Sequence, residues 1–182
     1  MLEEKNNVIY LNVVNGEIQR WMGKGNPVKT YNKVGGQIKK LTTENRSFDG
    51  KEIKYFFIQM VDGDERYSVQ IPMYGGAGPD VLRCLAYAIK NGLDIVNGDV
   101  VTIQAYSRVK DGKTYTNANV YYGSNKLEWL HLPNGVSRED GLDQLYEEIV
   151  ACVSKGSNRG GSSVASPEEE FRSSPFGGHV RN

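Results

Sequence analysis

The chain has 182 residues, and its 22 Lys and Arg balance 22 Asp and Glu, so the formal net charge is zero. This length predicts one domain of ordinary size with additional segments. No apolar run reaches the roughly 18 residues of a membrane span, and the opening MLEEKNNVIYLNVV lacks the pattern of a secretory signal. We therefore expect a cytoplasmic protein that does not enter a membrane.

The charge is unevenly distributed along the chain. Nine basic residues face three acidic ones from Arg20 to Met60, a net charge of +6, whereas residues 136–182 carry five basic and eight acidic residues, a net charge of −3. A basic body with an acidic end predicts an interaction with a polyanion.

The cysteines and histidines indicate no metal centre. Cys84 and Cys152 fall at apolar positions of expected helices and lack the spacing of metal ligands, which favours a reducing compartment over a disulfide. Only two histidines are present, and His131 between two leucines is expected to be a packed or edge residue. We expect neither a metal nor a cofactor.

The chain begins with a predicted hairpin, over residues 1–26. Two short apolar strands flank Asn15-Gly16, which is the strongest short-range signal for a type I′ turn. The following Gly23 to Pro27 interrupts the pattern, so we expect this hairpin to be an addition to the main domain.

Residues 27–135 form the expected main domain, which is mainly β. Its expected elements are five strands with one helix between the third and the fourth, at residues 33–43, 52–61, 66–73, 79–91, 100–109 and 114–122. The pair Gly35-Gly36 in the first strand predicts a bulge, a sharp bend or a close backbone approach. Short turns such as Asp62-Gly63 and Asp111-Gly112 separate the strands.

Two segments follow the main domain. Residues 136–153 predict an amphipathic helix, begun by the capping pair Ser137 and Asp140, and packing on its own domain is favoured over docking of a partner. Residues 154–182 are rich in Gly and Ser and cannot bury a core, which predicts a flexible tail.

The order of strands and helix is that of the OB-fold, a five-stranded barrel whose strand 2–3 face and loops bind oligonucleotides or oligosaccharides. Residues 33–122 resemble the OB-fold single-stranded DNA-binding proteins of bacteria and their phages, most closely in NGDVVTIQAYSRVKDGKTYTNANVYY at residues 97–122. The resemblance implies a barrel and a role in replication, recombination or repair, in a bacterial cytoplasm or an infected host cell.

Aromatic and basic residues alternate along much of the chain, and single strands are held by stacking on aromatic faces and by a basic groove. In the last two strands the apolar alternation turns Tyr106, Tyr115 and Tyr121 outward. For Tyr55 and Phe57 the pattern leaves open whether they belong to the core or to a stacking platform for bases. Trp129 is expected in the core. The candidate DNA-binding residues are Arg20, Trp21, Lys24, Lys29, Tyr31, Lys33, Lys39, Arg46, Phe48, Lys54, Tyr55, Tyr106, Arg108, Lys110, Lys113, Tyr115 and Tyr121.

The tail has a second resemblance, to the acidic tails by which many single-stranded DNA-binding proteins recruit replication proteins. The residues concerned are Glu168, Glu169, Glu170, Phe171 and Phe176. The family's tail ends at a phenylalanine, whereas this chain continues to Asn182 past a basic residue. A tail that only increases solubility therefore stays open as the alternative.

The functional hypothesis is sequence-independent binding and protection of single-stranded DNA by a protein that is not an enzyme. Gly75-Gly76-Ala77-Gly78 lacks the lysine of a phosphate-binding loop, which favours a plain loop. We expect a homo-oligomer or a cooperative array, and RNA stays open as a ligand. The alternatives are an OB-fold protein-interaction or assembly module that binds no nucleic acid, and an oligosaccharide-binding barrel.

Overall fold

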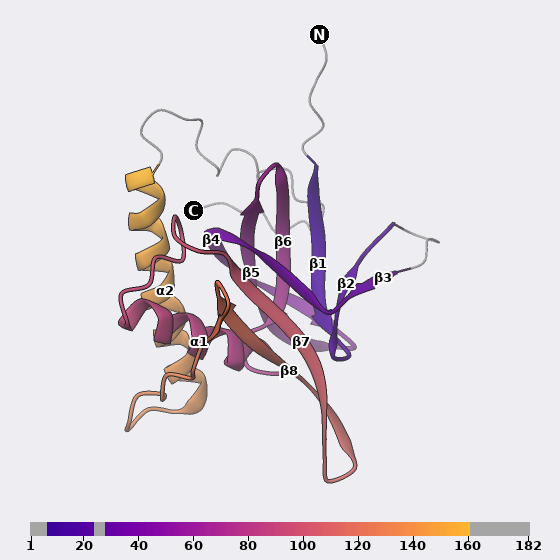
Figure 1. Cartoon of the computed structure of the whole chain (residues 1–182). Helices are drawn as coiled ribbons and strands as arrows, with labels where there is room; N and C mark the ends of the chain where they lie inside the picture. The colour runs from indigo at the N-terminus through magenta and orange to yellow at the C-terminus, as the bar shows by residue number, and fades with distance from the viewer. Residues whose placement is uncertain (1–6, 24–27, 161–182) are drawn as a thin grey trace.

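A computed structural model describes residues 7–23 and 28–160 of the chain, with the side chains of residues 158–160 excepted (Figure 1). Its elements in chain order are β1 (Val8–Val14), β2 (Glu17–Arg20), β3 (Lys29–Tyr31), β4 (Lys33–Phe48), β5 (Lys51–Asp62), β6 (Glu65–Pro72), α1 (Gly78–Lys90), β7 (Val101–Lys110), β8 (Lys113–Tyr122), β9 (Asn125–Lys126) and α2 (Arg138–Gly160). The mainly β class is confirmed.

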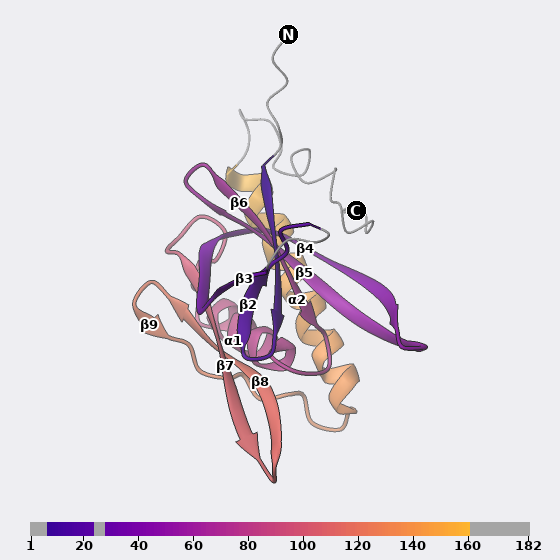
Figure 2. The same cartoon turned by 90° about the vertical axis from the view of Figure 1, so that its right-hand side faces the viewer.

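The strands of the described segments form one mixed sheet in the order β3-β2-β1-β6-β5-β4-β7-β8-β9. The sheet is open, because β3 and β9 lie at its two ends. The expected three strands, helix and two strands are present as β4, β5, β6, α1, β7 and β8. Figure 2 shows that the β4–β5 and β7–β8 hairpins extend as two arms in different directions.

Strand β4 joins the two halves of the sheet. Residues 33–36 pair with β7, and the pairing with β5 runs from Gln37 to Phe48. The partner of β4 changes directly after the glycine pair. The two backbones come close there, because a Cβ on Gly36 would lie only 2.8 Å from the Val61 carbonyl oxygen. The expected close backbone approach is therefore present at Gly36, and a register shift between Ile38 and Lys40 adds a bulge just after the pair.

The N-terminal hairpin extends this sheet beyond β6. Its turn is the predicted type I′, with φ of 54° at Asn15 and 73° at Gly16. Strand β1 pairs in parallel with β6, and the Gly16 N–H donates to Thr116 Oγ1 of β8 at 2.9 Å. The sequence did not predict this pairing, because parallel pairing joins distant segments and leaves no local signal.

Helix α1 is held against β8 by a buried carboxylate. Asp80 in its first turn accepts hydrogen bonds from Asn117 Nδ2 at 2.9 Å and from the Ala118 N–H at 3.0 Å. The loop before the helix is tight, because a Cβ on Gly78 would lie 1.7 Å from the Pro72 carbonyl oxygen. The Gly78 N–H donates to the Gly75 carbonyl at 3.2 Å, so this amide is used within the loop.

Helix α2 begins as predicted and ends later than predicted. Ser137 Oγ accepts the Asp140 N–H at 3.1 Å, which is the expected cap. The helix continues past Val153 to Gly160, because tertiary contacts support its last turns. Gly156 lies against Val96, and Ser157 Oγ donates to the Lys39 carbonyl at 3.0 Å. The boundary of the tail at residue 154 was therefore placed too early.

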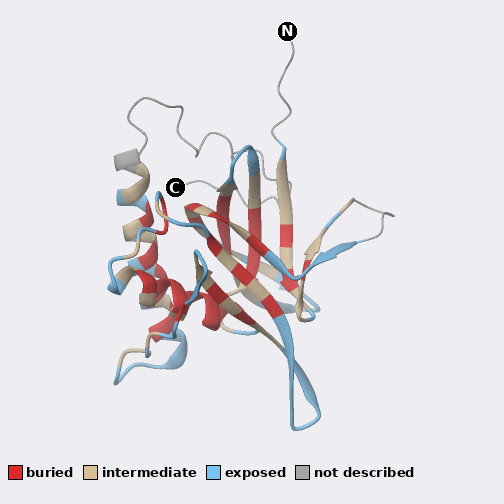
Figure 3. Cartoon of the chain, viewed as in Figure 1, coloured by how far each residue is buried: buried red, intermediate tan, exposed pale blue. Residues whose placement is uncertain are grey.

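The core lies between the helices and the sheet face turned toward them, here called the inner face (Figure 3). Phe56 on β5 meets Tyr146 on α2, with ring centres 6.4 Å apart. Cys84 is buried and Cys152 half-buried, and both are free thiols. Trp129 is not in the core as expected, since it is 47% exposed and carries the Arg83 guanidinium 4.8 Å from its ring centre.

Candidate nucleic-acid interface

Strand β5 is apolar on both faces, and the structure separates the two. Phe56 and Ile58 belong to the core, whereas the buried Phe57 lies outside the core cluster. Register places Phe57 opposite Gln70 of β6, and Gln59 opposite both Lys40 of β4 and Ser68 of β6. Residues opposite one another share a face, which defines an outer face formed by Lys40, Arg46, Phe57, Gln59, Ser68 and Gln70.

Arg46 is a cation of the outer face that three neighbouring side chains hold in place. Its guanidinium carbon lies 5.2 Å from the Phe57 ring centre, Nη1 donates to Gln70 Oε1 at 2.9 Å, and Nη2 pairs with Glu44 at 3.2 Å. A planar guanidinium held over a ring is a platform on which a base can stack while the positive charge attracts phosphate.

Beside this platform lie buried polar groups. Gln59 is fully buried and Ser68 nearly so, yet both polar atoms of the Gln59 amide and the Ser68 hydroxyl have no hydrogen-bond partner in the described part of the chain. An unmade hydrogen bond at a buried polar group costs about 1–3 kcal/mol. A bound ligand that supplies donors and acceptors would remove this cost.

The β7–β8 arm carries a second basic and aromatic surface. Register pairs Arg108 with Tyr115 and Lys110 with Lys113, which places these four side chains on one face together with Tyr106. All five residues are exposed, and Figure 3 shows the end of the arm in solvent. We call these five residues the arm face.

The base of the arm is held on its other side. Gly16 of the β1–β2 turn sits against Ser107, where an added Cβ would meet Ser107 Oγ and its backbone nitrogen, and it donates to Thr116. Ser107 and Thr116 are opposite one another in the hairpin. The N-terminal hairpin therefore braces the arm and leaves the arm face open to a ligand.

Two of the predicted lysines are used inside the fold. Lys39 Nζ donates to the Val96 carbonyl at 3.0 Å and to Gln37 Oε1 at 3.4 Å, and burial lowers its pKa, with Asp94 opposing the shift. Lys54 pairs with Asp143 of α2 at 3.4 Å and lies 5.8 Å from the Tyr74 ring centre. Neither lysine belongs to the outer face or the arm face.

The other predicted residues are spread over the molecule. The half-buried Tyr55 lies on β5 two residues before Phe57, and the exposed Phe48 lies at the end of the β4–β5 arm. Tyr121 donates its hydroxyl to Gln104 at 3.1 Å. Trp21 and Lys29 are exposed near β2 and β3, while Arg20, Tyr31 and Lys33 surround a cavity treated below. Lys24 and the tail residues Glu168, Glu169, Glu170, Phe171 and Phe176 lie outside the described residues.

Sequence reasoning missed most of the outer face. Gln59, Ser68 and Gln70 carry neither charge nor ring, so an aromatic-basic criterion passes over them, and Lys40 was counted only in the general basic charge. A period-two pattern of polar residues in β6 was visible in Ser68 and Gln70. Only the register shows that they border Phe57 and Gln59.

The described segments hold no cluster of three or more His, Cys, Asp or Glu that could bind a metal ion. None of their helices is both long and apolar enough to cross a bilayer. Comparisons with protein-family models, with curated proteins and with solved structures return no match. The function is therefore inferred from the outer face and the arm face.

Proposed function

We propose that the protein binds single-stranded DNA without sequence preference and protects it during replication, recombination or repair in a bacterial or infected host cytoplasm. The observation that carries the proposal is Arg46 stacked on Phe57 next to the unpaired Gln59 amide and Ser68 hydroxyl. On this surface a ring can stack on a base, a cation can contact a phosphate, and an amide can form hydrogen bonds to the edge of a base.

Binding on these surfaces combines two sequence-tolerant forces. Bases stack on the Arg46–Phe57 pair and on the tyrosines of the arm face, because every base has a π-face. The cations of both surfaces replace counterions along the phosphates, so affinity falls as salt rises. Neither force reads the base sequence, as a coating protein requires.

The proposed fold is an OB barrel opened by its N-terminal hairpin. The five strands β4 to β8 with α1 after the third have the order of that fold, and β4 pairs with strands of both halves. Strand β1 occupies the edge of β6, and the β1–β2 turn reaches β8. The outer face then corresponds to the strand 2–3 face on which OB-folds bind oligonucleotides.

The test is a titration of the full chain with a long oligothymidine, followed by intrinsic Trp and Tyr fluorescence at several salt concentrations. Lys110→Gln with Lys113→Gln removes two charges from the arm face, and Lys90→Gln with Lys155→Gln removes the same charge from exposed helical positions. Each phosphate contact contributes about 0.7 to the slope of log affinity against log salt. The arm variant is expected to lower that slope by about 1.4, and the helix variant to leave it unchanged.

Two results would contradict the proposal. One is the absence of saturable quenching at low salt. The other is an equal loss of salt dependence in both double variants, since this would mean that only net charge matters and not the arm face.

The alternative function is a protein-interaction module that binds no nucleic acid. The observation in its favour is the exposed Trp129 with Arg83 stacked on it, because Trp and Arg dominate the energetics of protein interfaces. Under this alternative the unsubstituted protein does not bind oligothymidine, and Trp129→Ala abolishes its capture of a partner protein. Recruitment of replication proteins by residues 168–176, and self-association along a strand, are further proposals within the DNA-binding function.

A further inference from the structure

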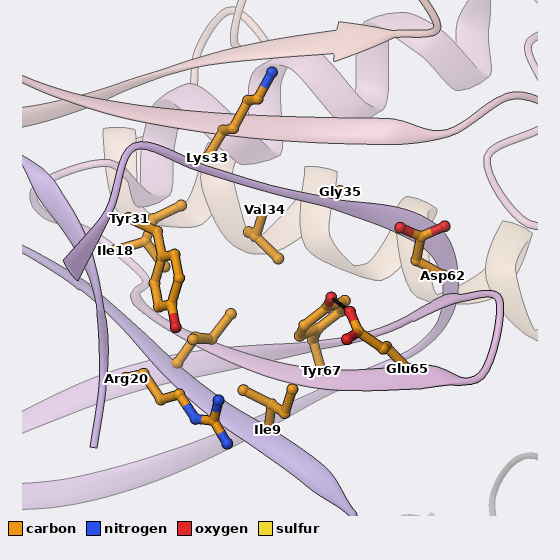
Figure 4. A pocket seen from close by; sticks show the side chains of 11 residues that line it. Ile9, Ile18, Arg20, Tyr31, Lys33, Val34, Gly35, Asp62, Glu65 and Tyr67 are labelled. Carbon is orange, nitrogen blue, oxygen red and sulfur yellow. Dashed lines mark hydrogen bonds between the residues drawn. The ribbon is translucent and has the colours of Figure 1, made fainter. Parts of the chain in front are cut away.

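A cavity of about 240 Å³ opens on the inner side of the sheet, between the N-terminal strands and β4 (Figure 4). Its apolar lining is formed by Ile9, Leu11, Ile18 and Val34. Tyr31 of β3 stands at one wall, and Lys33 points away from the space (Figure 4). The cavity is separate from the outer face, since three of its four apolar residues belong to the core and the fourth packs against it.

The two ends of the cavity carry opposite charge. Arg20 of β2 lies at one end, and Asp62 and Glu65 from the β5–β6 hairpin lie at the other (Figure 4). The Tyr67 hydroxyl donates to the Glu65 carboxylate. Burial, followed by this hydrogen bond, raises the pKa of Tyr67 to about 12, so the phenol remains a donor and fixes one carboxylate at the cavity.

Size and chemistry restrict the ligand. A volume of 240 Å³ equals the liquid volume of about eight waters and lies below the range of about 300–1,000 Å³ for drug-sized ligands. The space therefore suits one planar base rather than a chain of several nucleotides. A ring stacked on Tyr31 would place an attached phosphate toward Arg20 and its far edge toward the carboxylates.

We propose that this cavity binds one nucleotide whose base carries an amino group at pyrimidine position 4 or purine position 6, cytosine or adenine, through Arg20, Tyr31 and the Asp62–Glu65 pair. Carboxylates accept hydrogen bonds from such amino groups and repel the carbonyl oxygens that replace them in uracil and hypoxanthine. The proposal goes beyond sequence-independent strand binding, because it assigns a base-selective site on the opposite face of the sheet. The nucleotide can be free or can be the end of a strand.

The first experiment compares matched nucleotides on the full chain by isothermal titration calorimetry. CMP and UMP differ in one exocyclic group and in the proton of the adjacent ring nitrogen, as do AMP and IMP, so size and phosphate are constant within each pair. We expect the amino-bearing member of each pair to bind at least tenfold more tightly. Equal affinities within both pairs, or no binding of any of the four, would overturn the inference.

Two substitutions in the β5–β6 hairpin distinguish a direct role of the Glu65 carboxylate from a general effect of negative charge. Glu65→Gln keeps an oxygen that can accept from Tyr67 but presents an amide to the base, and Asp64→Asn changes the same charge at an exposed neighbour that does not line the cavity. We expect Glu65→Gln to remove the preference for CMP over UMP and Asp64→Asn to retain it. Thermal melting checks that both variants fold, and retention of the preference in a folded Glu65→Gln variant would refute the assignment.

The source of the nucleotide is distinguished with oligothymidines that carry a single dC at the 5′ end, at the 3′ end or at an internal position. Tighter binding with dC at one end alone identifies the strand end. Tight CMP binding without any effect of dC identifies a free nucleotide. If the full chain binds oligothymidine but not CMP, this inference is overturned and the proposed function stands. If it binds CMP but not oligothymidine, only the proposed function is overturned.

Discussion

Phe56 and Phe57 show how far neighbouring residues can differ in role. Phe56 meets Tyr146 in the core, while Phe57 lies on the outer face under Arg46. A substitution at Phe57 would alter both packing and binding, because the side chain is almost fully buried. The exposed tyrosines of the arm face give a cleaner test of stacking.

Tyr115→Ala is expected to weaken oligothymidine binding by about 1–3 kcal/mol, the contribution of one stacked base. Tyr115 is 43% exposed, so its truncation should leave the free energy of unfolding nearly unchanged. The control is Val109→Ala, because Val109 is 70% exposed and alternates onto the other side of the same arm. Fluorescence titration measures binding, and a similar loss in both variants would exclude stacking on Tyr115.

The thiol of Cys84 is expected to make stability fall in alkali. Burial is the largest cause that raises its pKa from 9.0 to about 12, so the native state holds this proton more tightly than the unfolded chain. Stability is then complete below pH 9 and declines toward pH 12, by up to about 1.4 kcal/mol per pH unit. Urea unfolding from pH 8 to 11.5 measures the slope, which should be shallower in Cys84→Ala. An identical slope would contradict this assignment.

At the scale of elements, short turns and strand alternation were predictable, whereas strand partners were not. Asn15-Gly16 and the inward residues Val101 and Ile103 followed from local patterns and are confirmed. The parallel β1–β6 pairing and the last turns of α2 depend on contacts between distant residues. The candidate site divides in the same way, since the arm face lies in one hairpin and the outer face is assembled from three strands.

The loop before α1 provides a matched pair of glycines. Gly78→Ala would place a methyl group 1.7 Å from the Pro72 carbonyl oxygen, whereas nothing lies within 4 Å of a Cβ on Gly75. Overpacking of this kind typically costs about 1–3 kcal/mol. Urea unfolding should therefore show a loss in Gly78→Ala and almost none in Gly75→Ala. Equal stability of the two variants would mean that the loop yields without cost.

At the scale of the whole molecule, one sheet separates two kinds of surface. The inner face is covered by α1, α2 and the core side chains, and the outer face carries Lys40, Arg46, the Phe57 ring and the unpaired Gln59 amide. Because β4 belongs to both halves, a change at its glycine pair would displace the arm relative to the outer face. We therefore expect Gly36→Ala to weaken oligothymidine binding as well as stability, measured by titration and urea unfolding. Unchanged binding in a destabilised variant would show that the two surfaces act independently.

The parallel pairing of β1 with β6 also has a consequence for how the chain is made. The ribosome produces the first hairpin well before its partner strand, so Leu11 lacks its neighbour Val69 until β6 has emerged. During that interval the hairpin of one nascent chain can pair with the β6 edge of a second chain whose own hairpin has not yet docked. Exchange of an identical element between copies is the usual origin of a swapped dimer, and crowded synthesis on a shared messenger would favour it over dilute refolding.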